Sequence, residues 1–322
     1  MFVTSVTVRV PAKINLQLAV GPPRPDGYHG LVTVFHAVSL FDDVTVAAAE
    51  ADSVVVTGEG AGLVPENGDN LALRAVRALR QAMARRAAGA PGPLGASGAV
   101  DALDGAGGVA VTIAKRIPVA GGMAGGSADA AAALVACNEL WGAGLAPQEL
   151  CAVAGEVGSD AAFPLLGGTA VGRGRGEQLA PALVSPVDFH WVLAFADGHL
   201  STPAVFRALD KQRARREVPE PELSNELMAA LRAGDVENLG ATLSNDLQEP
   251  ALTLFPALRK TLDAGLEAGA RGAQVSGSGP TCYFLARDPA HATDLAVALS
   301  GAGVCRSVAT AAGPAPGAWV VS

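Results

Sequence analysis

Residues 118–132 read PVAGGMAGGSADAAA, and this glycine-rich stretch is the most informative part of the sequence for the fold. An apolar, strand-like run at 109–113 precedes it, and an Ala-rich segment with high helix propensity follows it. The pattern predicts a strand, a Gly-rich loop and the start of a helix. Glycines allow peptide N–H groups to point inward, and the helix N-terminus adds unpaired N–H groups and a positive dipole end. The stretch therefore indicates a cradle for an anion, of which phosphate is the common biological case.

Two well-known phosphate loops do not fit this stretch. The Walker A loop needs a lysine directly after its second spaced glycine, but Gly126 is followed by Ser127. The Rossmann loop needs G-x-G-x-x-G and an acidic residue about 20 positions on. The nearest frame here holds Gly122, Ala124 and Ser127, and Glu139 is the only acidic residue near that distance. A flexible Ala/Gly loop in a chain with 39 glycines stays open as the alternative.

The length and composition bound the organisation of the chain. At 322 residues the chain exceeds the usual size of one domain. Prolines at 181 and 186 precede a new apolar run, so we predict one domain over residues 1–184 and a second over 185–322. With 50% hydrophobic and 17% charged residues, the chain has enough apolar side chains for a buried core.

The charge and the cysteines exclude several classes of partner. A formal net charge of −8 argues against binding to nucleic acid or to an anionic membrane, since both need a basic surface. No apolar run reaches the roughly 18 residues that a membrane helix needs. The four cysteines are too scattered for a disulfide framework or a zinc site, which favours the cytoplasm. We expect a monomer or a weak homodimer.

Two polar pairs near the N-terminus are candidate site residues. Lys13 and Asn15 lie two positions apart within a strand-like run, so they share one face of the strand. Lys13 either extends to the surface or points into a site. The DGYHG segment is predicted to be the tip of a loop that presents Tyr28 and His29, although a simple turn explains this pair equally well.

Later segments add a carboxylate, a helix and a second glycine-containing loop. Asp160 follows Ser159 at a predicted helix start, where N–H donors would keep a carboxylate ionised, and a purely structural role at the helix start is the alternative. Residues 71–86 have the apolar spacing of a helix, and 87–108 read as a loose Gly/Ala/Pro loop to which we assign no chemistry. Residues 276–279 form a second loop at which another part of the backbone could approach closely.

Three separated pieces form one recognisable pattern. They are PAKIN near the start, PVAGGMAGGSADAA in the middle and VSGSGPT near the end. Their order and spacing resemble the three motifs of the GHMP small-molecule kinases across essentially the whole chain. The resemblance implies an α+β fold of two domains, a ribosomal-protein-S5-like N-terminal domain and an α/β C-terminal domain, with the active site in the cleft between them. It also implies ATP and Mg²⁺ as cofactors, with no metal ligand assigned.

The resemblance further implies roles for individual residues. Asp160 would be the general base, and Lys13 would stabilise the developing alkoxide and the transferring phosphoryl group. Within the family, the sequence is most similar to members whose substrate is a polyol linked to cytidine diphosphate. Residues implied to bind that substrate are Asn15 at the polyol end, Tyr28, His29 and Phe206 at the cytosine, and Gly277 and Ser278. Residues implied to bind ATP are Pro118, Val119, Ala120, Gly121, Gly122, Met123, Ala124, Gly125, Gly126, Ser127, Ala128, Asn70 and Lys115.

The chain departs from the family pattern inside the Gly-rich loop. Ala120 and Ala124 occupy positions where many relatives carry glycine, and Asp129 stands where many carry Asn. The alanines permit phosphate contact if their φ angles are negative, and we expect Asp129 to turn away from ATP. Other members of the family act on homoserine, mevalonate or sugars, and a nucleotide-binding relative without catalysis is a further alternative.

Overall fold

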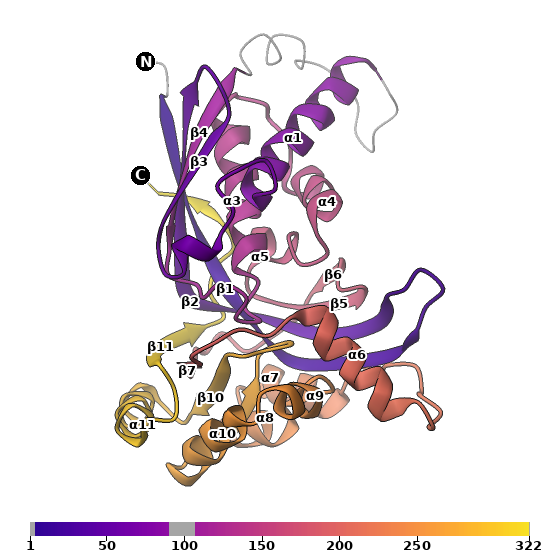
Figure 1. The fold of residues 1–322 in the computed structure, drawn as a ribbon, viewed down its shortest axis with the longest axis vertical. Helices are drawn as coiled ribbons and strands as arrows, with labels where there is room; N and C mark the ends of the chain where they lie inside the picture. Colours follow the sequence, from indigo (N-terminus) through magenta and orange to yellow (C-terminus); the bar gives the residue numbers. More distant parts are fainter. Residues whose placement is uncertain (1–3, 90–106, 322) are drawn as a thin grey trace.

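The computed structural model describes residues 4–89 and 107–321, and the segment to which we assigned no chemistry lies largely outside this range. In the described residues the chain forms two sheets with helices packed on them (Figure 1). The larger sheet has eight strands in which β12, β1, β2, β4 and β3 follow in that order, with β5 beside β2, β6 beside β5 and β8 beside β1. Its strands are β1 (Ser5–Pro23), β2 (His29–Ala49), β3 (Ser53–Gly58), β4 (Gly108–Lys115), β5 (Thr169–Gly174), β6 (Gln178–Pro181), β8 (Ser244–Asn245) and β12 (Trp319–Val320).

The second sheet has four antiparallel strands in the order β11, β7, β10, β9. Their bounds are β7 (Phe189–Phe195), β9 (Gly272–Val275), β10 (Cys282–Ala286) and β11 (Ser307–Gly313). Side chains alternate across β10, so that Tyr283 and Leu285 join the core shared with the larger sheet while Cys282 and Phe284 face the outer helices. This small sheet is therefore buried on both faces.

The helices cover one face of the larger sheet and the outer face of the smaller one (Figure 1). Helix α3 contacts α1, β1 and β2, and α11 contacts β7 and β11. The helices at the larger sheet are α1 (Leu71–Ala87), α3 (Gly125–Leu140), α4 (Pro147–Val157) and α5 (Phe163–Leu166), with a 3-10 turn η1 (Ala61–Leu63). The remaining helices are α6 (Thr202–Arg213), α7 (Asn225–Ala233), α8 (Val236–Thr242), α9 (Gln248–Leu254), α10 (Ala257–Glu267) and α11 (Pro289–Ala302).

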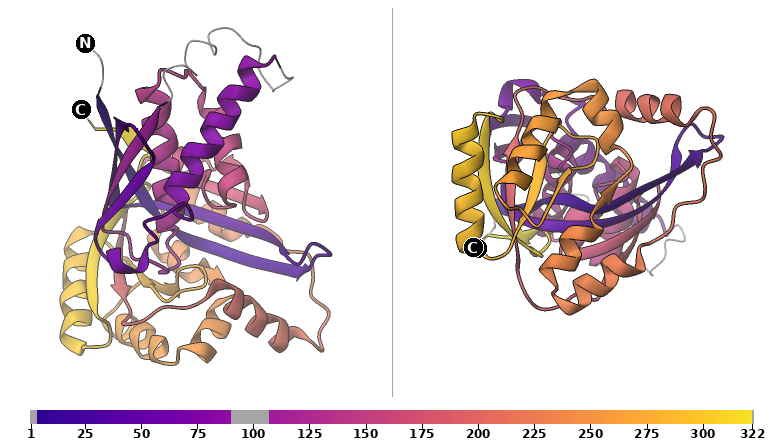
Figure 2. Two further views of the ribbon diagram at one scale, coloured as in Figure 1. Left: turned by 45° about the horizontal axis from the view of Figure 1, so that its top comes forward. Right: turned by 90° about the horizontal axis from the view of Figure 1, so that it is seen from below.

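The long hairpin of β1 and β2 connects the two layers. Val8 and Ile14 belong to the hydrophobic core at the larger sheet. Leu18 and Val20 belong to a second core, which also contains Phe284 of the smaller sheet. Both views in Figure 2 show the end of this hairpin extending alongside α6. Arg213 of α6 fixes it there by donating a hydrogen bond of 2.5 Å to the carbonyl oxygen of Val20. The hairpin thereby presents its residues to a space shared with the C-terminal half.

Most sequence-based element predictions are confirmed, with corrections at their ends. The helix predicted over 71–86 is α1, and the strand, loop and helix around residues 118–132 are β4, a loop and α3. The break predicted at Pro11 is only a shift of register in one continuous strand. The four cysteines are free, and no helix in the described residues is long and apolar enough to cross a membrane. Two short strands of the C-terminal half, β8 and β12, pair with β1 in the larger sheet, so the two halves of the chain share that sheet. The domain boundary at 184/185 stays a prediction.

His36 is a buried titratable group at the junction of the two layers. Its ring lies edge-on to Trp191, at 5.6 Å between ring centroids, and its Nδ1 is 2.9 Å from the Thr169 hydroxyl. Burial lowers the pKa of His36 from 6.5 to about 3. The unfolded chain therefore binds a proton between these values that the folded chain does not, and stability is lost as the pH falls below 6.5.

We expect His36 to make folding acid-sensitive. Relative to His36→Gln, the wild type should lose about 1.4 kcal/mol of unfolding free energy for each pH unit below 6.5 until pH 3. Urea unfolding at a series of pH values measures this difference. The matched control is His199→Gln at an exposed position, for which the difference from wild type should not change with pH. A pH-independent difference for His36→Gln would contradict the burial of a neutral imidazole.

Candidate active site

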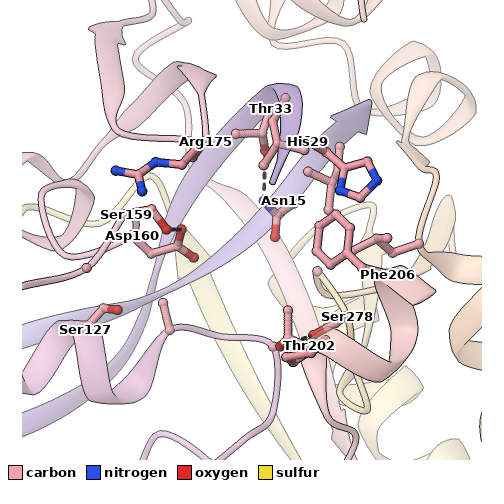
Figure 3. Close-up of a pocket in the computed structure, with 18 of the residues that line it drawn as sticks. Asn15, His29, Thr33, Ser127, Ser159, Asp160, Arg175, Thr202, Phe206 and Ser278 are labelled. Carbon is pink, nitrogen blue, oxygen red and sulfur yellow. Dashed lines mark hydrogen bonds between the residues drawn. The ribbon is translucent and has the colours of Figure 1, made fainter. Parts of the chain in front are cut away.

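A cavity of about 670 Å³ lies where the hairpin, the Gly-rich loop and α6 meet (Figure 3). It is the larger of the two pockets described below, and most of the predicted site residues line it. The predicted residues that do so are Lys13, Asn15, Tyr28, His29, Ala120, Gly121, Gly122, Ala124, Gly125, Gly126, Ser127, Asp160, Phe206, Gly277 and Ser278. Residues separated by more than 250 positions in the sequence therefore share one cavity, as both Lys13 and Ser278 line it.

The carbonyl oxygen of Gly122 joins the three sequence motifs. It accepts a hydrogen bond of 2.8 Å from Lys13 Nζ and one of 3.0 Å from Ser276 Oγ. A Cβ atom at Gly122 would overlap the carbonyl oxygen of Ser276, and its φ is +76°, so glycine is required at this position. These contacts hold the Gly-rich loop against both β1 and the second glycine-containing loop.

The Gly-rich loop ends in the N-terminus of α3, which begins at Gly125. The first N–H groups of a helix have no intrahelical partner, so those of α3 can bind an anion at the cavity. The negative φ angles that we set as the condition for phosphate contact at the two loop alanines are not found: φ is 52° at Ala120 and 59° at Ala124. The backbone at both alanines adopts the left-handed conformation, which glycine adopts without the clash of a Cβ atom. The structure thus retains the loop geometry of a glycine-rich sequence at a cost in strain.

Lys13 is buried at the floor of the cavity. Its Nζ donates a hydrogen bond of 2.7 Å to Asn15 Oδ1, and Asn15 in turn donates one of 2.8 Å to the Thr33 hydroxyl. Burial lowers the pKa of Lys13, and the negative charge of Asp160 partly offsets that effect. The side chain therefore points into the site and does not extend to the surface.

Asp160 lies across the cavity from His29 and Phe206 (Figure 3). Ser159 Oγ donates a hydrogen bond of 3.3 Å to Asp160 Oδ1. The expected place at a helix start is wrong, because α5 begins at Phe163 and its N-cap is Ala162. The carboxylate is held in a turn, where it remains available to a hydroxyl in the cavity.

An aromatic wall forms the opposite end of the cavity. The rings of His29 and Phe206 stack with centroids 5.1 Å apart, and His29 Nε2 is 2.8 Å from Asp210 Oδ1. The side chain of Tyr28 is 55% exposed at the rim. His29 starts β2, so only Tyr28 belongs to the predicted turn. Asp210 was not predicted, although its place four residues after Phe206 puts it on the same face of α6.

Several residues predicted to bind ATP do not line the large cavity. Met123 and Ala128 are fully buried. Pro118 and Val119 line a smaller pocket of about 280 Å³, which Gly121 shares with the large cavity. Asn70 is the N-cap of α1, where its side chain accepts a hydrogen bond from the N–H of Ala72.

Lys115 lies beneath the loop in a buried cluster with two carboxylates. Its Nζ is 2.6 Å from Asp42 Oδ2 and 2.7 Å from Asp129 Oδ2. Burial raises the pKa of Asp129, while the two carboxylates outweigh burial and raise that of Lys115. Asp42 Oδ1 also accepts hydrogen bonds from the backbone N–H groups of Arg116 and Ile117. Asp129 is thus turned away from the cavity, as expected, and the cluster fixes the chain that enters the loop.

We predict that Lys115 stabilises the fold and does not contact ATP directly. Lys115→Met leaves two buried carboxyl groups without their cation, which should lower the unfolding free energy by about 3–5 kcal/mol. Urea unfolding measures this loss, and Lys260→Met at an exposed site of α10 is the matched control. A variant with unchanged stability but a weaker affinity for ATP would instead support contact with the nucleotide.

Comparison with known proteins shows the family to which the chain belongs. Residues 70–168 match the family model of the GHMP kinases N terminal domain, and residues 227–305 match that of the GHMP kinases C terminal. The chain belongs to the GHMP kinase family. The predicted α+β, two-domain fold is confirmed.

Individual relatives are similar over nearly the whole chain. The 4-diphosphocytidyl-2-C-methyl-D-erythritol kinase of Thermobifida fusca (strain YX) is 54% identical, with 99% of each chain covered. The kinase of the same name from Mycolicibacterium smegmatis is 52% identical, covering 98% of this chain and 92% of the relative. A crystal structure of 4-(cytidine 5'-diphospho)-2C-methyl-D-erythritol kinase superposes with a TM-score of 0.71 at 32% identity, covering 95% of this chain and 98% of the other.

Proposed function

We propose that this chain is the kinase that transfers the γ-phosphoryl group of ATP to the 2-hydroxyl of 4-diphosphocytidyl-2-C-methyl-D-erythritol. The products would be the 2-phosphate and ADP, and the reaction belongs to the non-mevalonate pathway to isoprenoid precursors. The observation that carries the proposal is one cavity that joins a phosphate loop, the pair Lys13 and Asp160, and an aromatic wall. The 54% identity to a kinase of that name supports the particular substrate.

The Gly-rich loop would hold the phosphates of ATP. Its glycines and the N-terminus of α3 face the cavity, which suits a polyphosphate. No cluster of three or more His, Cys, Asp or Glu side chains in the described residues could hold a metal ion by itself. This fits Mg²⁺, which is usually held by substrate phosphates with one or two protein oxygens. Ser127, near the start of α3, and Asp160 both line the cavity and carry oxygen atoms that would hold Mg²⁺, which would supply charge neutralisation on the phosphates.

Asp160 and Lys13 would carry the proton and the charge of the reaction. The Asp160 carboxylate would accept the proton of the substrate hydroxyl, and the Lys13 ammonium group would stabilise the alkoxide and the phosphoryl group as it transfers. Phosphoryl transfer depends mainly on alignment and charge stabilisation, so these two groups with the loop are sufficient. Asn15, which accepts a hydrogen bond from Lys13, would hold the polyol beside both of them.

The aromatic wall would select the substrate. His29 and Phe206 already stack on each other, so a cytosine ring would lie against the face of this pair that is open to the cavity, and Tyr28 would cover it from the rim. Asp210 would orient the His29 ring by accepting a hydrogen bond from Nε2. Gly277 and Ser278 would close the cavity beside Lys13 and Asn15, because a Cβ atom at Gly277 would lie 3.3 Å from Asn15 Oδ1. Homoserine and mevalonate have no ring to stack on this wall, which disfavours them as substrates.

The cellular location, the oligomeric state and the domain boundary of the enzyme are separate proposals. We propose a cytoplasmic enzyme, which the four free thiols support. The monomer or weak homodimer and the division at 184/185 stay predictions.

We expect the purified protein to release ADP in the presence of 4-diphosphocytidyl-2-C-methyl-D-erythritol. Mevalonate, homoserine and simple sugars should give no release above background, because they leave the aromatic wall empty. A coupled ADP-release assay with this substrate panel tests the proposal. Turnover of mevalonate or homoserine without turnover of the cytidyl compound would refute the assignment.

We expect Asp160→Asn to lose turnover while it keeps ATP binding. Removing a positioned base should lower kcat by about 10²–10⁴-fold, since the hydroxyl proton has no acceptor. Calorimetry measures ATP binding and the ADP-release assay measures kcat. The control is Asp188→Asn, an exposed position outside the cavity, which should leave both quantities unchanged. Full activity of Asp160→Asn would remove this residue from the role of base.

A further inference from the structure

Arg175 is a cavity residue to which neither the sequence motifs nor the reaction chemistry gives a role. It lies in the turn between β5 and β6 and lines the cavity with its side chain only partly exposed. Its guanidinium carbon lies 5.1 Å from the centroid of the Tyr28 ring. Glu177 on the same turn forms an ion pair with Arg175, with 4.0 Å between Oε1 and Nε, a distance too long for a hydrogen bond. The pair leaves the N–H groups of the guanidinium able to donate to a ligand.

The position of Arg175 connects the two ends of the cavity. Tyr28, on which it lies, belongs to the wall where the base would stack. The next residue of the turn, Gly176, approaches the other end, because a Cβ atom there would lie 3.7 Å from Asp160 Oδ1. Figure 3 shows Arg175 on the side of Ser159 and Asp160, with Asn15 between that side and His29. Arg175 therefore lies near both Tyr28 of the aromatic wall and Asp160 at the other end of the cavity.

The other cations of the cavity are less suited to that position. Lys13 Nζ is already held by Asn15 Oδ1 and by the carbonyl oxygen of Gly122 at the floor. Arg207 is exposed on α6, next to Phe206 in the sequence. The two acids of the cavity, Asp160 and Asp210, lie at its opposite ends, and Asp210 is paired with His29. Arg175 therefore supplies positive charge on the side of the cavity where Asp160 lies.

We infer that Arg175 binds the diphosphate of the substrate, between the cytosine at the aromatic wall and the polyol at Asp160. This inference rests on the proposed function, because it takes a polyol linked to cytidine diphosphate as the ligand. A diphosphate that joins these two ends carries negative charge on both phosphates, and the planar guanidinium can bind phosphate oxygens through two parallel hydrogen bonds. Arg175 thus determines specificity for a charged linker and is not one of the reacting groups.

The test compares cytidine diphosphate with cytidine, which share the base and differ in the phosphates. Calorimetric titrations use the full chain saturated with a non-hydrolysable ATP analogue, so that the probes cannot occupy the Gly-rich loop. The wild type should bind cytidine diphosphate at least about tenfold more tightly than cytidine. Arg175→Ala should lose about tenfold in affinity for cytidine diphosphate and leave the affinity for cytidine unchanged. The affinity of Arg175→Lys for cytidine diphosphate should lie between those of the wild type and Arg175→Ala, because lysine keeps the charge but lacks the planar guanidinium group.

Matched variants separate the inference from its alternatives. Arg173→Ala, two residues earlier at an exposed position outside the cavity, should bind both probes as the wild type does. An equal loss for both probes in Arg175→Ala would overturn the inference and assign Arg175 to the support of Tyr28. Unchanged binding in Arg175→Ala, with a selective loss in Arg207→Ala, would also overturn it and place the diphosphate at α6. These titrations need no turnover, so they are independent of the ADP-release assay that decides the proposed function.

Discussion

The carbonyl oxygen of Gly122 is the point on which the site depends. It receives hydrogen bonds from Lys13 Nζ and Ser276 Oγ, so a single peptide joins β1, the Gly-rich loop and the loop after β9. The peptide N–H of Lys13 also donates to the carbonyl oxygen of Met123, at 3.3 Å. Three segments distant in the sequence are thereby fixed relative to one another before any ligand binds. Such preorganisation is what phosphoryl transfer requires, since its catalysis rests on alignment.

Two buried lysines act on the loop from different sides. Lys13 uses its hydrogen bonds to hold the loop from the cavity, where burial lowers its pKa and an acceptor such as a phosphate would restore favourable contacts. Lys115 holds the loop from below, where Asp42 and Asp129 compensate its charge. Lys13 has a single neutral side-chain partner and an open cavity beside it, and a buried charge with so few partners is costly. This difference in environment is the physical basis on which we propose Lys13, and not Lys115, as the cation that contacts the ligand.

Local patterns in the sequence predicted the elements, and the contacts between distant segments were beyond them. The spacing of Lys13 and Asn15 placed both on one face of a strand, and their side chains are indeed hydrogen-bonded. The partner of Lys115, Asp42, lies 73 residues earlier, and no local pattern connects them. The left-handed alanines could not be predicted either. Their φ angles follow from the fixing of the loop through Gly122, which is a tertiary constraint that overrides the preference of alanine.

The charge of the whole chain and the charge of its cavity have opposite consequences for binding. A net charge of −8 repels anions at long range, but that field is screened within about 10 Å at ordinary salt. Inside the cavity the balance is local: Lys13 and Arg175 flank the acid at one end, and Asp210 is paired with His29 at the other. Backbone N–H groups at the start of α3 add positive potential without adding net charge. The proposed binding of two polyphosphate ligands is therefore compatible with an acidic chain, because each would be recognised by groups within a few ångströms and not by the surface as a whole.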